Sequence, residues 1–450
     1  MGKMLLDLFL KQIFGQPFIL ISLVVFVGYL AMKEKLSKAI IGALKASIGI
    51  IVMGMGSGAL IGNFNKVLAS VTTATGIQGA GLNTYPTMTA GYAIMDGILG
   101  AGTGATWGLY TLLVAFILNV ALVAFRKITK IRAVYLTGNA MIVQAGIATF
   151  LVWKFFNMGM ISTIIIASII TALYWGIFST LLIKPTHAIT NADFTVAHQQ
   201  MFVDYVAYKV APYLGDPTKD DIEKKKMPTS LNALQDNIIA TFLVMFVSIA
   251  IIFVVIGKDN IDWLRSAKGL SQAGLTNNIV FLFWIAVTLT ANIVVLLSGV
   301  RMFVGEIMLS FKGISEKILP GAVAGVDCAA IFAFAPKSVV LGLIFGTVGQ
   351  VIGLLGLIVF KSPIFLIPGF IPLFFDNATI AIFANKFGGW KAAAIICTVN
   401  GIVQIFGSML VIKMTGLTWW QGSADYATVW LGITFILKII GQMLGIPVAA

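Results

Sequence analysis

Apolar stretches of about 20 residues recur along the whole chain, and each is long enough to cross the hydrocarbon core of a bilayer as a helix. Apolar side chains make up 59% of the 450 residues, and charged side chains make up only 10%. A water-soluble domain of this composition would expose large apolar patches and aggregate. The sequence therefore predicts an all-α polytopic membrane protein.

Eleven stretches have the length and composition of spanning helices. They lie at 18–32, 39–62, 107–125, 134–156, 160–183, 238–257, 277–300, 338–360, 363–386, 392–413 and 426–448. The N-terminal sequence has no small-residue cleavage site after a short apolar core, so we expect no removable signal peptide.

The net charge of +13 raises the possibility of a nucleic-acid partner, but Lys and Arg cluster in short loops between the apolar stretches. Membrane proteins keep such loops in the cytoplasm, and we therefore expect no nucleic acid. The basic loops 33–38, 126–132 and 184–237 share one side only if 63–106 enters the membrane and returns without crossing it. This segment is rich in Gly and Thr, which predicts a re-entrant hairpin covered by protein or water.

The second half of the chain repeats the order of the first, with a spanning helix, a small-residue segment and another spanning helix. By the charge count the two units start on opposite sides of the membrane. The pattern predicts an inverted-topology repeat within one transmembrane unit, with 39–237 as the first repeat and 277–450 as the second. Many transporters have this architecture, and their substrate sites lie near the midplane.

The polar segment 184–237 interrupts this order. Its centre, 194–214, is aromatic-rich and amphipathic, which predicts an interfacial helix. The charged stretch 215–228 that follows is either a solubilising cytoplasmic surface or a docking patch for a partner.

Asp327 is a single carboxylate within a run of small and apolar residues. A charge inside a membrane is costly unless it lines a cavity or has partners, so Asp327 is a candidate site residue. The alternative is a structural hydrogen bond to backbone N–H groups at the tip of a hairpin. The corresponding tip in the first repeat offers Asn83, Thr84 and Tyr85. Two polar tips that meet at the midplane would enclose a hydroxyl-rich solute.

His198, Gln199 and Gln200 form a second polar cluster, which either lines the same site or satisfies local packing. Asn139 and Gln144 lie in an otherwise apolar helix, where hydrogen bonding between helices is an equal alternative. We expect no metal or other cofactor. The chain has two cysteines, which lie in apolar runs, and two histidines without a Cys or carboxylate cluster nearby in the sequence. No nucleophile triad or phosphate-binding loop is present.

Seven stretches of the sequence carry a resemblance to a known family. They read LYWGIFSTLLIKPT, AHQQMFVDYVAYKVAPYLG, GVRMFVGE, ISEKILPGAVAGVDCAAIFAFAPKSVV, GTVGQ, IPGFIPLFFDNATIAIFANKFGGWKAA and VIKMTGLTWW. In these stretches the chain resembles the ascorbate-type membrane IIC component, or permease subunit, of the bacterial phosphoenolpyruvate-dependent sugar phosphotransferase system. The resemblance extends over nearly the whole chain.

The resemblance implies a homodimer in the bacterial inner (cytoplasmic) membrane, built from eleven-helix protomers. Each protomer would have a core domain and a V-shaped dimerisation domain, and the core would carry the sugar by an elevator movement. The cytoplasmic IIA and IIB proteins would be partners, because a phosphocysteine on IIB phosphorylates the sugar on delivery. The family's substrate residues match Thr84, Tyr85, His198, Gln199 and Asp327.

Three positions depart from the family pattern. Asn139 stands where ascorbate members have a histidine, Val143 where they have a glutamine, and Gly54 where they have another glutamine. Each unmatched buried polar group costs about 1–3 kcal/mol, so the substrate is either ascorbate or a different sugar, alditol or sugar acid. Two other functions stay open. One is an ion-coupled sugar transporter that uses Asp327 or Glu306 as its coupling site, and the other is a sugar receptor that does not transport.

Overall fold

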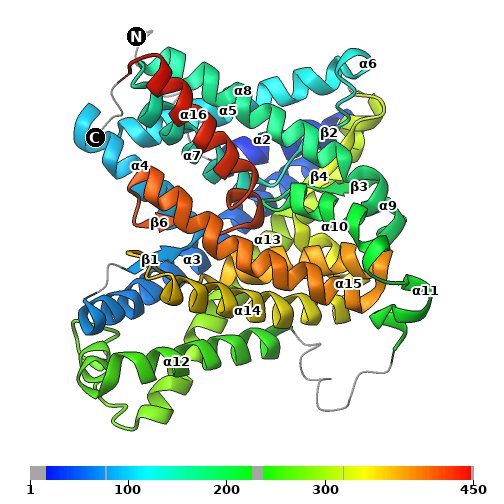
Figure 1. Cartoon of the computed structure of the whole chain (residues 1–450). Coiled ribbons are helices and arrows are strands. Elements are labelled where there is room, and N and C mark those ends of the chain that lie inside the picture. The colour runs from blue at the N-terminus through cyan, green and yellow to red at the C-terminus, as the bar shows by residue number, and fades with distance from the viewer. Residues whose placement is uncertain (1–16, 77–78, 226–236, 318, 447–450) are drawn as a thin grey trace.

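Long helices dominate the computed structural model, which describes residues 17–76, 79–225, 237–317 and 319–446 (Figure 1). Within these residues, eight helices are long and apolar enough to cross a membrane, or nine if the bent pair Thr241–Val254 and Ile256–Arg265 forms one span. The predicted polytopic helical membrane class is confirmed, whereas the count of eleven spans stays a prediction.

The first half of the chain alternates helices with short strands. Its elements are α2 (Pro17–Ala31), α3 (Leu36–Thr75), β1 (Gly79–Leu82), α4 (Thr84–Leu99), α5 (Thr103–Ala124), α6 (Arg126–Thr129), β2 (Ala133–Tyr135), α7 (Gly138–Phe156), α8 (Met160–Leu181), α9 (Ile183–Thr190), β3 (Phe194–Val196) and α10 (Met201–Leu214).

The second half follows a short connecting region. This region holds α11 (Pro217–Asp220), the 3-10 turn η2 (Ile222–Lys224) and α12 (Asn237–Arg265). Then come α13 (Asn278–Lys317), β4 (Val323–Val326), η4 (Cys328–Phe334), α14 (Pro336–Val359), β5 (Phe365–Ile367), α15 (Phe370–Thr415), β6 (Trp419–Trp420), η5 (Ala424–Tyr426) and α16 (Val429–Met443).

The segment predicted as a hairpin at 63–106 begins as a helix rather than as irregular backbone. α3 continues to Thr75 and ends at Gly76, whose φ of +64° is a left-handed conformation that glycine adopts at low cost. Strand β1 and helix α4 follow. The sequence pattern missed the helical part because a run of Ala, Ser and Thr has no apolar periodicity of its own.

Helix α15 folds back on itself and so accounts for two of the predicted spans. Asn377 Nδ2 donates to Gln404 Oε1, and Asn400 Nδ2 donates to Asn377 Oδ1, at 3.1 and 3.0 Å. A straight helix would hold Asn377 and Gln404 about 40 Å apart. The reversal occurs at Gly389, which has a φ of +79°. The predicted stretches 363–386 and 392–413 correspond to the two arms of this hairpin.

Small residues let α14 approach both arms of α15. A Cβ atom added to Gly342 would lie 2.0 Å from the carbonyl oxygen of Asn377, and one added to Gly349 would lie 2.1 Å from that of Thr398. Membrane helices associate without a hydrophobic driving force, so close backbone contact of this kind supplies much of the attraction. The small-residue face holds the second half together.

Six short parallel strands correct the expectation of a purely helical fold. They form two three-stranded sheets, in the orders β5-β1-β6 and β2-β4-β3. In each sheet the middle strand comes from one half of the chain and the two outer strands come from the other half. The strands have two to four residues, which is too short to produce a period-two signal in the sequence.

The amphipathic segment predicted at 194–214 consists of β3 followed by α10, and α10 lies against α15 at Gly388. The charged stretch after it is more than a solvated surface. Glu223 accepts hydrogen bonds from the backbone N–H groups of Lys337 and Ser338 at the start of α14, and Asp221 accepts one from Asn385 on α15. We call residues 216–225 the clasp, because they join the ends of α14 and α15.

Candidate functional site

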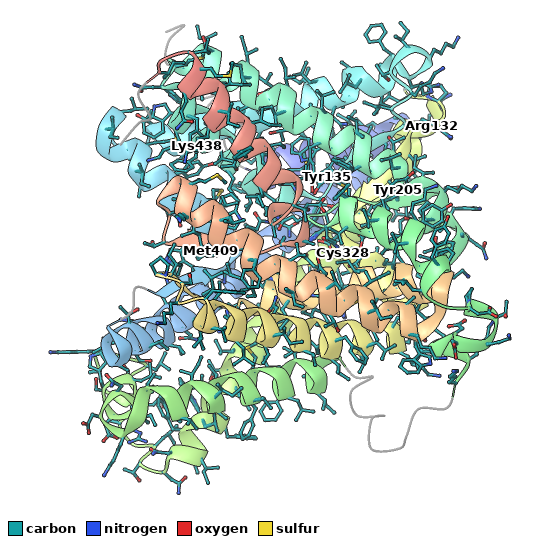
Figure 2. All side chains as sticks on the ribbon, in the orientation of Figure 1. Arg132, Tyr135, Tyr205, Cys328, Met409 and Lys438 are labelled. Atoms are coloured by element: carbon teal, nitrogen blue, oxygen red, sulfur yellow. The ribbon has the colours of Figure 1, made fainter. Side chains whose placement is uncertain are left out.

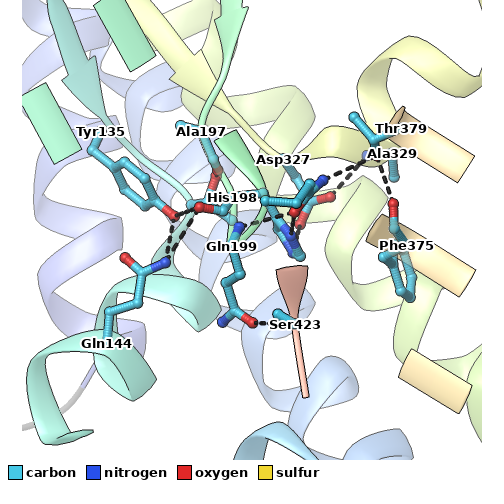
Figure 3. A network of polar contacts seen from close by, with 12 residues as sticks. Tyr135, Gln144, Ala197, His198, Gln199, Asp327, Ala329, Phe375, Thr379 and Ser423 are labelled. Carbon is cyan, nitrogen blue, oxygen red and sulfur yellow. Dashed lines mark hydrogen bonds and ion pairs between the residues drawn. The ribbon is translucent and has the colours of Figure 1, made fainter. Parts of the chain in front are cut away.

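The candidate site lies where β2, β4 and β3 end (Figure 3). Parallel strands direct their carboxyl ends to one edge of the sheet, where ligands bind in many open parallel sheets. The Ala197 N–H donates to the carbonyl of Val326 at 2.8 Å, and Thr137 Oγ1 donates to the carbonyl of Ala197. This pairing brings His198, two residues after β3, beside Asp327, directly after β4.

Asp327 makes the structural hydrogen bond that was the alternative prediction, and its second carboxylate oxygen lies near His198. Its Oδ1 accepts a hydrogen bond of 2.9 Å from the N–H of Ala329 and so caps the first turn of η4. Its Oδ2 lies 3.9 Å from His198 Nε2. The side chains of both residues are almost fully buried, with exposed fractions of 3% for Asp327 and 7% for His198. One carboxylate oxygen is structural, and the other faces the site.

A chain of hydrogen bonds fixes the tautomer of His198. Thr379 donates its single hydroxyl proton to the carbonyl of Phe375, at 2.6 Å, and therefore accepts from Gln200 Nε2, at 3.0 Å. The Gln200 Oε1 atom then faces His198 Nδ1, at 2.7 Å, and also accepts from the Gln199 N–H. Because Oε1 is an acceptor, Nδ1 carries a proton, and in the neutral imidazole the Nε2 lone pair faces Asp327.

Gln199 connects this strand end to the second sheet. Its Oε1 accepts from Ser423 Oγ, at 3.2 Å (Figure 3). Its carbonyl accepts from the N–H of Asp425. Ser423 follows β6, and β6 is paired with β1 up to the bond from the Asn83 N–H to the Trp420 carbonyl. The loops after β3 and β6 therefore meet, and the Asn83 tip lies directly beside the β6 end.

Several buried polar atoms near these strand ends have no hydrogen-bond partner among the described residues. They are Asn83 Oδ1, Thr84 Oγ1, Asn139 Oδ1 and both polar atoms of the Gln421 side chain. A buried polar group without a partner costs about 1–3 kcal/mol. Native proteins leave few such groups, so a concentration of them after β1, β2 and β6 indicates a place where a polar ligand supplies the missing bonds.

The other predicted site residues divide into two groups. Asn139 lies in the first turn of α7, and Val143 is fully buried one turn later. The next residue, Gln144, supplies an amide, but this amide is bonded to Tyr135 and to the carbonyl of His198, so it supports the site from behind. Gly54 lies within α3, where a Cβ atom added to it would meet no atom within 4 Å.

Two further predicted residues remain outside this geometry. The side chain of Tyr85 lies outside the described residues, although its backbone begins α4 beside Thr84. Glu306 is on α13, where it accepts from Tyr29 Oη at 2.7 Å and lies 3.4 Å from Lys45 Nζ. Glu306 is thus part of an interhelical pairing among α2, α3 and α13.

The site also corrects the view that no cysteine lies near a histidine. His198, Asp327 and Cys328 each offer a donor atom, and these atoms lie within 4.8 Å of one another. Nitrogen, oxygen and sulfur ligands of this kind suit zinc, so the three residues could hold such an ion.

Sequence analysis missed two buried carboxylates that organise the loop after β6. Asp376 Oδ2 accepts from the Ala424 N–H and from Gln404 Nε2. Asp425 accepts from the N–H groups of Phe202 and Val203 at the start of α10, and from Tyr174. The argument used for Asp327, a carboxylate within an apolar run, applies equally to Asp376 and would have found it.

Comparison with known proteins agrees with the resemblance seen in the sequence. Residues 12–438 match the EIIC-GAT family, described as the sugar-specific permease component of the PTS system. The ascorbate-specific PTS system EIIC component of Mycoplasma pneumoniae is 30% identical over 442 residues. The match covers 90% of this chain and 65% of that protein, so this chain spans about two thirds of the relative's length.

Proposed function

Because this chain belongs to the EIIC-GAT family of sugar-specific permease components of the phosphotransferase system, we propose that it carries a sugar or sugar-like polyol across the membrane to a separate IIB protein. A phosphocysteine on IIB would phosphorylate the solute on the cytoplasmic side, and IIA would recharge IIB. The chain itself would bind and move the solute without donating the phosphoryl group.

The observation that carries this proposal is the set of unpaired polar atoms beside His198 and Asp327. Asp327 Oδ2 and the Nε2 lone pair of His198 are both acceptors, at 3.9 Å from each other. A solute with adjacent hydroxyl groups would donate one hydrogen bond to each of them. Its other hydroxyls would bond with the unpaired oxygens of Asn83 and Thr84 and with the Gln421 amide.

The solute is either ascorbate or a related sugar, alditol or sugar acid. The relative from Mycoplasma pneumoniae is named for ascorbate. Asn139 offers an unpaired oxygen where a histidine stands in ascorbate members, and Val143 offers no hydrogen bond. The two positions lie one turn apart on α7, so together they would select among solutes that differ at one or two hydroxyls.

For the transport movement we propose an inverted repeat whose core shifts relative to a scaffold, as in an elevator. The element order supports it. From α3 to β3, a helix, a strand, two helices, a strand, two helices and a strand follow one another, with the short helices α6 and α9 added. From α13 to β6 the same order recurs, with η4 in the place of α4 and the two arms of α15 in the place of α7 and α8. The first helices of the two units, α3 and α13, each have 40 residues and lie against each other. We assign 39–237 and 277–450 to the two repeats.

Within this proposal, α2, α3, α12 and α13 would form the V-shaped, dimerising scaffold. The Glu306–Lys45–Tyr29 pairing connects three of these four helices. An acidic group held in this way supports a structural role rather than ion coupling at Glu306. The strand ends and the hairpin of α15 would belong to the moving core.

The test is sugar uptake by His198→Ala and Asp327→Asn in inner-membrane vesicles that contain IIA and IIB. Both variants should lose uptake by at least tenfold while they insert and dimerise normally, because each removes an acceptor from the site. His187→Ala is the matched control, since His187 is the other histidine and is exposed on α9.

Two results would contradict the proposal. Uptake at the wild-type level by both site variants would exclude the site. Uptake that follows an ion gradient and continues without IIB would favour the ion-coupled transporter. A panel of ascorbate, pentoses, hexoses and alditols, measured by calorimetry on the purified protein, would identify the solute.

A further inference from the structure

A groove lies between the end of α15 and α16. Its volume is about 740 Å³, and Leu410, Met414, Leu431 and Phe435 contribute apolar walls. Lys413 and Lys438 line the same groove. Figure 2 shows Lys438 on α16, and Met409 on the part of α15 that leads to the groove. The groove therefore combines apolar walls with two cationic side chains.

Both lysines lie on helices that are long and apolar enough to span a membrane. Neither lysine appears in an ion pair or a side-chain hydrogen bond among the described residues, whereas Lys45, on α3, is close to Glu306. Lysine in a spanning helix is costly unless its ammonium group reaches water or an anion at the membrane interface. Two such lysines beside one groove favour an anionic ligand.

The shape of the groove indicates what the rest of the ligand is. Gly432 lies in the groove on α16, and a Cβ atom built there would meet no atom within 4 Å. The wall is thus open at this position, and the nearby Phe435 is 54% exposed. A soluble anion would leave these apolar walls uncovered, but a lipid acyl chain would cover them.

We propose that this groove binds an anionic phospholipid, with the phosphate between Lys413 and Lys438 and an acyl chain along Leu431 and Phe435. A zwitterionic lipid would satisfy the apolar walls but would leave the two ammonium groups without a net negative partner. The site is independent of the sugar site, because none of its lining residues belongs to the strand ends described above.

The first test compares lipid binding to the purified full chain by native mass spectrometry, with phosphatidylglycerol and phosphatidylcholine as probes. A lysine near an anionic headgroup contributes about fivefold in affinity. Lys413→Gln combined with Lys438→Gln should therefore weaken phosphatidylglycerol binding by about 25-fold and leave phosphatidylcholine unchanged. Lys386→Gln is the matched control, because Lys386 is exposed on the same helix hairpin but outside the groove.

The second test locates the ligand. A photoreactive benzophenone side chain at Phe435, irradiated in native membranes, should yield a phospholipid adduct, and Gly432→Trp should reduce that adduct by filling the groove. Three results would overturn the proposal: equal binding of both lipids by the wild type, phosphatidylglycerol binding that survives the double lysine variant, or a cross-link to a second copy or to another segment of this chain.

Discussion

Thr379→Val tests the hydrogen-bond chain that orients His198. The hydroxyl of Thr379 accepts from Gln200 Nε2 at 3.0 Å, and Gln200 is fully buried. Valine has the same shape but no acceptor, so the Gln200 amide loses the partner that fixes its orientation. A buried donor without a partner costs about 1–3 kcal/mol, which corresponds to about 5- to 150-fold in an equilibrium constant.

Rotation of the Gln200 amide would give its NH₂ group a new environment, but it would also change the hydrogen bonding of His198. If the Gln200 amide rotates, its NH₂ group faces two donors, the N–H of Gln199 and His198 Nδ1–H, in place of the oxygen now bonded to both. His198 then changes tautomer, and its Nε2 no longer accepts a hydrogen bond from a hydroxyl group of the solute. We expect sugar affinity to fall by about tenfold or more, with a mixture of imidazole tautomers.

The tautomer can be measured directly because the chain has only two histidines. In ¹⁵N-histidine-labelled protein, wild-type His198 should carry its proton on Nδ1 when neutral. Thr398→Val is the matched control, since Thr398, like Thr379, donates to the carbonyl four residues earlier in α15 but has no bond to Gln200. Thr379→Ser should restore the wild-type spectrum. A proton on Nε2 in the wild type, or identical behaviour of the two valine variants, would refute the reasoning.

Two further predictions concern stability and pH. Gly349→Ala should lower the melting temperature, because the added Cβ lies 2.1 Å from the Thr398 carbonyl oxygen and such overpacking costs about 1–3 kcal/mol of folding free energy. Gly305→Ala on α13 should leave the melting temperature unchanged, because no atom lies within 4 Å of the added Cβ. Hydrogen bonds from Lys225, and to a smaller extent from Lys391, hold the pKa of Asp220 below its usual value. The clasp is therefore intact above a pH of about 4 and loosens as the pH falls through that lowered pKa. Hydrogen exchange in 216–225 measures this, and loosening at neutral pH would contradict it.

Chemical reasoning from single residues selected Asp327 and His198, which the structure brings together, without any knowledge of the backbone. A carboxylate in an apolar run is costly wherever the run lies, so Asp327 could be found without knowledge of the fold. The same reasoning applied to Asp376 would have located the loop after β6. Gln421 could not have been found, because a glutamine at the end of a strand of two residues carries no signal until the strand itself is known.

Contacts between residues far apart in the chain account for the parts of the fold that the sequence did not predict. β1 pairs with β5 and β6, which lie hundreds of residues later, and a strand of two to four residues is stable only because those partners exist. The sharp reversal of α15 also depends on the conformation of a single glycine, Gly389, and the sequence does not distinguish it from the other glycines in a chain that has 46. Hydropathy predicted both arms but not their antiparallel contact.

The exchange of strands between the two halves constrains any transport movement. Irregular backbone at membrane depth must have its polar groups satisfied by protein, and each sheet satisfies the middle strand of one half with strands from the other. Separating β4 from β2 and β3 would leave backbone N–H and C=O groups unpaired in a low-dielectric interior, at about 1–3 kcal/mol for each group. The two sheets and the strand-end loops, with His198 and Asp327, must therefore move as one body. A disulfide between Cys residues introduced at the paired positions Val134 and Ala324 should thus leave sugar uptake intact, and loss of uptake on oxidation alone would show that the sheet opens during transport.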